Sequence, residues 1–312
     1  MRLRISSQTK RQGRLLLKRA FRALFQHPVY QAKSGLARGF RVTGDLGFLG
    51  KSMTRRNRFL ARLNFAQQTV YDIGSYIGVT TLFFSKAVGP AGRVISIEPN
   101  PETFALLCKN VEMNGVTNVQ LCPVRLHKKR AKLDVAFSGP DDVWGEVVGP
   151  AESATAPGNP RKTQVIPMEV YPLDDYVEAH ALPPPHFIKM DTEGYEFDVL
   201  LGMQKVLREH KPSLLVEIHG DTQMRLHNLR GVIELLLALG YDVREMHSGR
   251  RLAAVNQIRR PRHVYCRPQG RADQASAPVA PSAEQSPRGV SSRGNKVVQE
   301  LRRIAHWFVG LG

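Results

Sequence analysis

Four side chains that can exchange protons are grouped in two short stretches of the sequence. Asp191 and Glu193 follow one apolar run, and Glu217 and His219 close the next. Short apolar runs bounded by polar residues are typical of buried strands in a parallel sheet. Because parallel strands end at the same edge of their sheet, we expect these four side chains to form one acid/base cluster.

Such a cluster suits the transfer of a group to a hydroxyl, for which a positioned base must accept the hydroxyl proton. We predict Asp191 or Glu193 as the base or as the group that orients the acceptor, with Glu217 and His219 in support. A structural interpretation competes with this one, since Asp191 could cap a helix and Glu193 could favour its positive end. Asp191 and Glu193 could also hold a divalent metal by their ligand chemistry, but we assign no metal site, because nothing fixes six oxygen ligands.

A second group of residues fits a nucleoside site. One strand-like run contains Asp72 and ends before Gly74, a tight turn leads to Gly78, and the next strand-like run ends in Glu98. This is the arrangement at the carboxyl edge of a doubly wound sheet, where a fixed carboxylate binds the ribose hydroxyls. The predicted cofactor-binding residues are Asp72, Gly74, Ser75, Tyr76, Gly78 and Glu98.

The spacing of the glycines separates two classes of cofactor. A dinucleotide site needs G-x-G-x-x-G, but Tyr76 and Val79 occupy the second and third glycine positions counted from Gly74. A bulky Tyr76 would fill the place of the phosphates, which disfavours a dehydrogenase. S-adenosyl-L-methionine has no phosphate, and Asp72 suits its ammonium group. We therefore predict S-adenosyl-L-methionine as the cofactor and a methyltransferase as the enzyme.

The elements that must hold these residues alternate along the middle of the chain. Short apolar runs and amphipathic stretches follow one another, which indicates an α/β fold with a mostly parallel sheet. Strands are expected at residues 69–73, 93–97, 118–122, 186–190, 213–218, 241–246 and 263–267. Helices are expected at residues 79–88, 101–114, 193–209 and 229–239. The last two strands lie close enough in sequence to form an antiparallel edge pair.

The charge of the chain is concentrated at its ends. The 312 residues carry a formal net charge of +18, and residues 1–62 alone hold 16 Lys/Arg against one acid. Residues 63–267 hold 23 basic and 23 acidic side chains. We therefore expect a basic N-terminal arm at 1–62, with an amphipathic helix around residues 17–25, and a neutral methyltransferase domain at 63–267.

Three further segments interrupt or follow the domain. Residues 138–162, rich in Gly, Pro, Ala and Ser, are predicted to form a mobile loop over the site, with Trp144 as its only large aromatic; a passive insertion remains the alternative. Residues 268–295 are predicted to be a disordered linker. Residues 296–312 are predicted to be a C-terminal amphipathic helix.

The cysteines and the apolar runs bear on location. Three cysteines without disulfide or zinc spacing favour a reducing, cytoplasmic compartment. No apolar run approaches the ~20 residues that a transmembrane helix needs. The basic arm could hold the protein peripherally on an anionic membrane surface or pack back onto the body, and both interpretations remain open.

Three blocks carry a resemblance to a known family: VYDIGSYIG from residue 70, YPLDDYV from residue 171 and FIKMDTEGYEF from residue 187, together with EPNP at 98–101. In these blocks, which span about half the chain, the sequence resembles the FkbM family of S-adenosylmethionine-dependent methyltransferases. The resemblance implies a Rossmann-like class I methyltransferase fold with seven strands. It also implies methylation of a hydroxyl on a sugar, glycolipid or related small metabolite.

The resemblance also assigns residues. It places the family's cofactor motif on Asp72, Gly74 and Gly78 and its ribose-binding acid on Glu98. The family's Asp-x-Glu-Gly signature falls on Asp191, Glu193 and Gly194. Where family members commonly have Ala-Asn after the first glycine, this chain has Ser75-Tyr76.

Two other functions compete with a small-molecule or glycan acceptor. A nucleic-acid methyltransferase could use the basic arm to neutralise phosphates, but the neutral body and the lack of an Asn/Asp-Pro-Pro-aromatic motif disfavour it. A non-catalytic interaction module with the methyltransferase fold would keep the fold and transfer no methyl group. The sequence leaves the acceptor and the oligomeric state open.

Overall fold

The structure is a computed structural model that describes residues 28–44, 53–137, 144–148, 164–219, 222–252 and 262–270. All of them fall within one compact unit, Met1–Ala275, and a second unit, Ser276–Gly312, lies outside the described residues. The amphipathic helices predicted around residues 17–25 and 296–312 also lie outside them. So does the predicted linker, except for residues 268–270.

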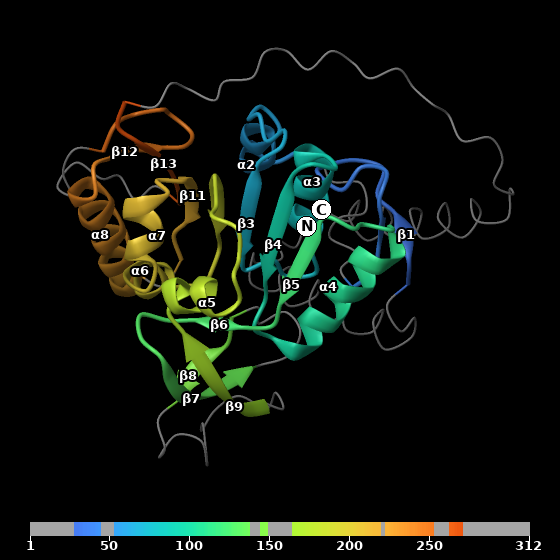
Figure 1. Ribbon diagram of the computed structural model, residues 1–312, viewed down its shortest axis with the longest axis horizontal. Coiled ribbons are helices and arrows are strands. Elements are labelled where there is room, and N and C mark those ends of the chain that lie inside the picture. Colours follow the sequence, from blue (N-terminus) through green and yellow to red (C-terminus); the bar gives the residue numbers. More distant parts are fainter. Residues whose placement is uncertain are drawn as a thin grey trace, which may run out of the picture. The chain divides into compact units, whose positions relative to one another are not determined.

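A seven-stranded sheet forms the centre of the described chain (Figure 1). Its strand order is β12-β13-β11-β10-β3-β4-β5, in which β13 runs antiparallel to both neighbours and all other pairs are parallel. The strands are β3 (Thr69–Ile73), β4 (Arg93–Ile97), β5 (Val119–Cys122), β10 (Phe187–Met190), β11 (Ser213–Glu217), β12 (Tyr241–Glu245) and β13 (His263–Pro268). The predicted α/β fold, its seven strands and its antiparallel edge pair are confirmed.

Alternate residues of the central strands pack into two apolar layers. Val70 of β3 lies in the layer that includes α2 (Arg55–Leu60) and α3 (Val79–Val88). Its neighbour Tyr71 lies in the other layer, with side chains from four helices. These helices are α5 (Leu173–Ala179), α6 (Glu196–Leu201), α7 (Gln204–Glu209) and α8 (Thr222–Ala238). Because β3 is buried on both faces, most of its residues are apolar.

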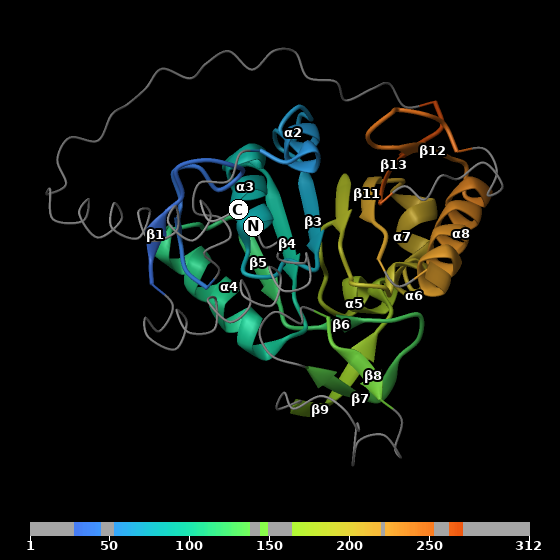
Figure 2. The ribbon, with the colours of Figure 1, turned by 180° about the vertical axis from the view of Figure 1, so that it is seen from behind.

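Helix α4 (Pro101–Met113) lies at the opposite end of the sheet from α8 in both ribbon views (Figures 1 and 2). The side chain of Asn100 caps α4 by accepting hydrogen bonds from two backbone N–H groups of its first turn. Pro101 stands at the first helical position, where no amide donor is needed. The strand–helix order that leads into α4 therefore follows from local sequence.

Two helix predictions need correction. The single helix predicted at residues 193–209 is divided into α6 and α7, which separate at Gly202. A Cβ atom at Gly202 would lie 2.3 Å from the carbonyl oxygen of His127, so the chain passes here too closely for any side chain. The last helix, α8, starts at residue 222 rather than at 229.

A second sheet was not predicted. It has the order β6-β9-β7-β8, with β6 (Arg125–Leu126), β7 (Ala131–Phe137), β8 (Glu146–Val148) and β9 (Gln164–Tyr171). Strand β8 lies inside the segment predicted as a mobile loop, and Trp144 beside it is fully buried. The guanidinium of Arg125 stacks on this ring at 5.4 Å from its centroid. Trp144 is therefore part of the core, which corrects its prediction as a residue of a mobile loop.

The body also begins earlier than residue 63. In the predicted arm, β1 (Tyr30–Gln31) pairs with β2 (Arg41–Val42), and Val42 is fully buried. The side chain of Asn110 on α4 fixes the next residue, Thr43, by bonding both its backbone N–H and its carbonyl. Residues 28–44 and 53–62 therefore pack against the domain, because their apolar side chains complete its core. None of the helices in the described part of the chain combines the length and apolarity that crossing a bilayer needs.

Candidate functional site

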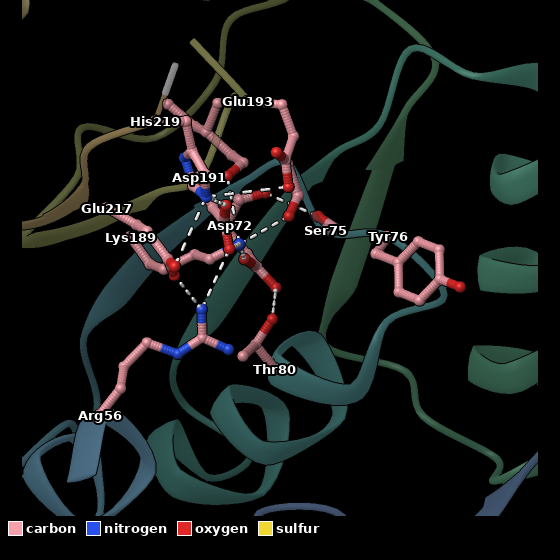
Figure 3. Close-up of polar contacts among 12 residues, drawn as sticks. Arg56, Asp72, Ser75, Tyr76, Thr80, Lys189, Asp191, Glu193, Glu217 and His219 are labelled. Carbon is pink, nitrogen blue, oxygen red and sulfur yellow. Dashed lines mark hydrogen bonds and ion pairs between the residues drawn. The ribbon is translucent and has the colours of Figure 1, made fainter. Parts of the chain in front are cut away.

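The structure brings the four predicted acid/base residues together at the carboxyl ends of β10 and β11 (Figure 3). The Nε2 atom of His219 lies 3.6 Å from Asp191 Oδ1 and 3.4 Å from Glu217 Oε1. Glu193 Oε1 lies 3.8 Å from the same nitrogen. One imidazole thus faces three carboxylates, as the adjacency of the two strands predicts.

His219 is also held from its other nitrogen. Its Nδ1 atom lies 3.1 Å from Glu196 Oε1, and Glu196 is fully buried at the start of α6. Burial alone lowers the pKa of His219, but the hydrogen bonds to Glu196 and Glu217 and the nearby charge of Asp191 outweigh it and raise the pKa to about 10. The imidazole is therefore protonated at neutral pH and serves here as a cation and hydrogen-bond donor.

Glu217 has more cationic contacts than the other carboxylates of the cluster. Arg56 Nη1 donates to its Oε2 atom at 2.6 Å, and Arg262 Nε donates to its Oε1 atom at 2.9 Å. His263 Nε2 lies 3.1 Å from Oε2. Burial would raise the pKa of Glu217, but the hydrogen bonds from His219 and His263 and the charge of Arg56 hold it well below its usual range. A carboxylate with so low a pKa is a poor proton acceptor.

Glu193 has a different environment. Its backbone adopts the left-handed conformation, with φ of 51°, and its side chain is 50% exposed. Partial burial raises the pKa of Glu193, while the charge of His219 lowers it and the charge of Asp191 raises it. Of the four predicted residues, Glu193 thus combines access to solvent with a raised affinity for a proton.

Asp191 joins this cluster to the neighbouring strand. Its Oδ2 atom accepts a hydrogen bond from Arg56 Nη1 at 3.0 Å and lies 3.6 Å from Lys189 Nζ. The side chain of Lys189 is 4% exposed, and its ammonium also lies 3.2 Å from Asp72 Oδ1. It donates to the Gly74 carbonyl at 2.6 Å. One buried lysine therefore connects both predicted sites.

Asp72 lies on β3 before Gly74, and its carboxylate has partners within the protein. The carboxylate is fully buried, and the hydroxyls of Thr80 and Thr81 both donate to its Oδ2 atom at 2.7 Å. The ammonium group beside it belongs to Lys189. Asp72 therefore holds the strand–turn–helix unit together from within.

The tight turn predicted after β3 is present, and its two glycines adopt positive φ values. Gly74 and Gly78 have φ values of 73° and 86°, which residues with a side chain rarely adopt. A Cβ atom at Gly74 would lie 1.8 Å from the carbonyl oxygen of Asp191, and one at Gly78 would lie 2.5 Å from a methyl group of Leu107. The first glycine thus allows the cofactor turn and the acid cluster to touch through their backbones.

Glu98 ends β4 as a fully buried carboxyl group. Its two oxygens accept hydrogen bonds from the backbone N–H groups of Tyr76 at 2.8 Å and Asn100 at 3.0 Å. Burial raises the pKa of Glu98 to about 8, although these hydrogen bonds lower it. A carboxylate oxygen can accept a second hydrogen bond, so the two hydroxyls of a ribose could each donate to one oxygen of Glu98. These residues therefore fit a nucleoside.

The two residues that depart from the family pattern lie in the same turn. Ser75 donates its hydroxyl hydrogen bond to the Asp72 carbonyl at 2.7 Å. Tyr76 has φ of 52°, and its ring points away from the acid cluster (Figure 3). Ser75 is thus a structural part of the turn, whereas the ring of Tyr76 lies on the side away from the acids.

Asp191, Glu217 and His219 also offer ligand atoms that all lie within 4.8 Å of one another, a set that could hold a metal ion. In the described structure, however, the Arg56 guanidinium bridges the two carboxylates. A metal-bound imidazole must be neutral, whereas the surroundings of His219 favour its protonated form.

Sequence reasoning missed four contributors to the site. Arg56 was assigned to the arm, and its contacts at 135 and 161 residues' separation leave no local signal. Arg262 and Glu196 likewise act through contacts distant in sequence. Lys189 did leave a signal, since a lysine inside a short apolar strand is rarely buried without a partner.

Residues 72–243, more than half of the chain, match the family described as the methyltransferase FkbM domain. The chain belongs to this family. The predicted Rossmann-like class I methyltransferase fold and the methyltransferase class are thereby confirmed. The FkbM assignment also supports S-adenosylmethionine as the cofactor, and the turn at residues 74–78 with Glu98 fits it.

The chain is also similar to two curated methyltransferases. "Methyltransferase 1" of Beauveria bassiana is 27% identical over 144 residues, which are 43% of this chain and 57% of that protein. "Hexuronic acid methyltransferase AglP" of Haloferax volcanii is 29% identical over 150 residues, which are 48% of this chain and 55% of that protein. The chain thus spans a little over half the length of the curated relatives that it matches.

One similar solved structure has a related description. A crystal structure described as methyltransferase FkbM, from Methylobacillus flagellatus, is 20% identical with a TM-score of 0.41. The match covers 66% of this chain and 45% of that one.

Proposed function

We propose that this FkbM-family protein is an S-adenosylmethionine-dependent O-methyltransferase that acts on a hydroxyl of a sugar, glycolipid or related small metabolite. The observation that carries the proposal is the acid cluster of Asp191, Glu193 and His219 next to the Gly74 turn. The hexuronic acid methyltransferase among the relatives supports a sugar hydroxyl as the acceptor.

In this proposal, the residues between β3 and α4 hold the cofactor. Glu98 would accept hydrogen bonds from the ribose hydroxyls, and the turn from Gly74 to Gly78 would lie against the nucleoside. S-adenosylmethionine, when bound, supplies an electrophilic methyl group. Asp72 acts indirectly, because it is buried beneath Thr80 and Lys189.

The residues at the ends of β10 and β11 would prepare the acceptor. Glu193 accepts the hydroxyl proton, since its side chain is half-exposed and its pKa is raised. Asp191 orients the hydroxyl, while Lys189 and Arg56 fix its carboxylate. His219 balances the negative charge that the carboxylates bring together.

We propose that the reaction needs no metal ion. The Arg56 guanidinium already bridges the two carboxylates that a divalent cation would need, and it does so at 3.0 and 2.6 Å. Activity should therefore be unchanged after dialysis against a chelator, and restoration of a lost activity by Mg²⁺ or Mn²⁺ would refute this part.

We further propose that residues 1–27 bring the enzyme to an anionic membrane or a similarly charged acceptor. They contain eight Lys/Arg and no acid. Because residues 28–44 and 53–62 pack in the core, a deletion that tests this function should remove residues 1–27 alone. We expect weaker binding to phosphatidylglycerol vesicles and unchanged binding of S-adenosylhomocysteine.

The experiment that tests the enzymatic function has two steps. Calorimetric titration with S-adenosylhomocysteine should show binding by the wild-type protein and at least tenfold weaker binding by Glu98→Gln. Glu112→Gln, which changes an exposed acid on α4, is the matched control and should bind as the wild type does. Incubation with S-adenosylmethionine and oligosaccharides containing hexuronic acid should then add the mass of one methyl group.

The two steps separate the alternatives. Cofactor binding without transfer to any hydroxylated acceptor would favour a different acceptor class. No cofactor binding by a folded wild-type protein would favour the interaction module. Equal binding by Glu98→Gln and wild type would contradict the assigned role of Glu98.

A further inference from the structure

A basic hollow lies at the outer end of the central sheet, away from the acid cluster. It has a volume of about 310 Å³ and is lined by Asp242, Arg244, Arg251, Arg267, Pro268, Gln269 and Gly270. Strand β13 separates the two places, since His263 at its start pairs with Glu217 and Pro268 at its end pairs with Tyr241. The hollow is therefore distinct from the site described above.

The register of the edge strands gathers three arginines around one carboxylate. Arg267 is the cross-strand partner of Asp242. The backbone of Arg251 forms an isolated antiparallel β-bridge with that of Arg244. Asp242 and Arg244 are two residues apart in β12, so they share one face of the sheet. Arg244 Nε lies 2.7 Å from the Asp242 carboxylate, Arg251 Nε 3.0 Å and Arg267 Nη2 3.4 Å.

The charges of this group do not balance. Among the residues that the structure describes here, three guanidinium groups share the Asp242 carboxylate, which leaves this group with a surplus of two positive charges. Like charges that face each other across a strand pair destabilise the sheet, and Arg244 and Arg251 are such a pair. The nearby Glu245 contacts Arg250 and Ser248 instead. An anion in the hollow would relieve the repulsion.

The two outer arginines are accessible to a ligand. The side chains of Arg244 and Arg251 are 41% and 56% exposed, whereas Arg267 is 13% exposed and its guanidinium lies 5.9 Å from the Tyr265 ring centroid. A guanidinium presents a planar fork of donors that matches the oxygens of a phosphoryl group. The volume exceeds that of a single phosphate and leaves room for part of its carrier.

We propose that the Asp242/Arg244/Arg251/Arg267 hollow binds a phosphoryl group. Asp242 holds the three arginines in place, and the phosphoryl oxygens take the remaining guanidinium donors. The carrier is either a soluble phosphorylated molecule or the headgroup of a phospholipid, both of which present the same chemistry. Binding at this edge does not depend on the methyl-transfer function of the acid cluster.

The test compares adjacent arginines in the full-length protein. Calorimetric titration with inorganic phosphate should give the same dissociation constant for the wild type and Arg250→Ala, because Arg250 does not line the hollow. Arg251→Ala should bind at least tenfold more weakly, and Arg251→Lys should fall between them, since lysine keeps the charge and loses the fork. Equal thermal midpoints would show that the variants are folded.

A second titration separates the two carriers. The same proteins are sedimented with phosphatidylcholine vesicles that contain or lack phosphatidylglycerol. Because residues 1–27 are themselves proposed to bind phosphatidylglycerol, the comparison is between variants that all keep these residues. Weaker binding to phosphatidylglycerol vesicles by Arg251→Ala than by Arg250→Ala supports the proposal with a lipid headgroup as the ligand, and weaker phosphate binding with equal vesicle binding supports it with a soluble ligand. Equal phosphate binding by Arg251→Ala and wild type, or no phosphate binding by either, would overturn the proposal.

Discussion

The two halves of the functional edge hold their acids in opposite ways. On the proposed cofactor side, Asp72 and Glu98 are fully buried and are hydrogen-bonded by neutral donors: threonine hydroxyls for the first and backbone N–H groups for the second. Asp72 also has a cationic neighbour, the buried ammonium of Lys189. On the proposed acceptor side, Asp191 and Glu193 are partly exposed, and cationic side chains surround the cluster. Only Lys189, among the residues described, contacts Asp72 and Asp191 together.

This difference indicates a division of labour. Buried acids with neutral donors form a fixed frame, because moving them would leave unpaired polar groups in the core. Partly exposed acids with cationic partners can exchange those partners for a ligand at a smaller cost in desolvation. The cofactor side is therefore suited to constant recognition, and the acceptor side to contacts that change during a reaction.

The connection between the halves predicts the largest effect. Lys189→Met should lower the free energy of unfolding by about 3–5 kcal/mol, because it leaves the Asp72 carboxylate buried without its cation. Urea unfolding measures the loss, and Lys86→Met, at an exposed site on α3, is the control. Asp72→Asn combined with Lys189→Met should cost less than the sum of the single changes. A Lys189→Met protein as stable as the control would show that the halves are independent.

The acceptor side alone should respond to Arg56. Arg56→Met removes the guanidinium that bridges Asp191 and Glu217, so we expect kcat to fall by about tenfold to a hundredfold, or about 1.4–2.7 kcal/mol in the activation barrier. S-adenosylhomocysteine should bind as tightly as before. Arg55→Met, on the exposed side of the same helix, is the control. Weaker binding of S-adenosylhomocysteine by Arg56→Met would contradict the separation of the cofactor side from the acceptor side.

The charge on His219 predicts a dependence of stability on pH. Its pKa is about 10 in the folded protein and about 6.5 when unfolded, so its contribution is complete below pH 6.5 and is lost as pH rises through 10. The free energy of unfolding should therefore fall between pH 6.5 and 10, and His219→Gln should remove the part of this fall that is due to the imidazole. Denaturant unfolding at several pH values would measure it. An identical decline in the wild type and His219→Gln would place the charge elsewhere.

The same contrast explains how much the sequence could predict. The geometry of the proposed cofactor side could be predicted because Gly74, Gly78 and Glu98 lie on consecutive strand–turn–helix units with clear polar and apolar patterns. The cluster of Asp191 and His219 was predictable because consecutive parallel strands place their ends together. In both cases the chain order itself fixes the proximity.

The other features of the site and the fold depend on tertiary contacts that the order of strands and helices along the chain does not determine. Arg56 belongs to a strongly basic segment in which no single arginine stands out, and only tertiary packing brings it to Glu217. Trp144 lies in a Gly- and Pro-rich stretch typical of loops, yet its ring is stacked on Arg125. The contact of Asp72 with Lys189 was not predicted for a related reason, because the same carboxylate suits a ligand ammonium and the buried Lys189.

The smallest effect should come from removing one of the hydrogen bonds to Asp72 without creating a cavity. Thr80→Val keeps the volume of the side chain but removes one of two hydroxyl donors at 2.7 Å from Asp72 Oδ2, so it should cost about 1–2 kcal/mol in unfolding free energy. Combined with Glu193→Gln, its cost should add to within about 0.5 kcal/mol, since the two residues share no partner. A larger coupling free energy would mean that Lys189 transmits changes between the residues around Asp72 and those around Asp191. The residues around Asp72 would then not be a fixed support for the acid cluster.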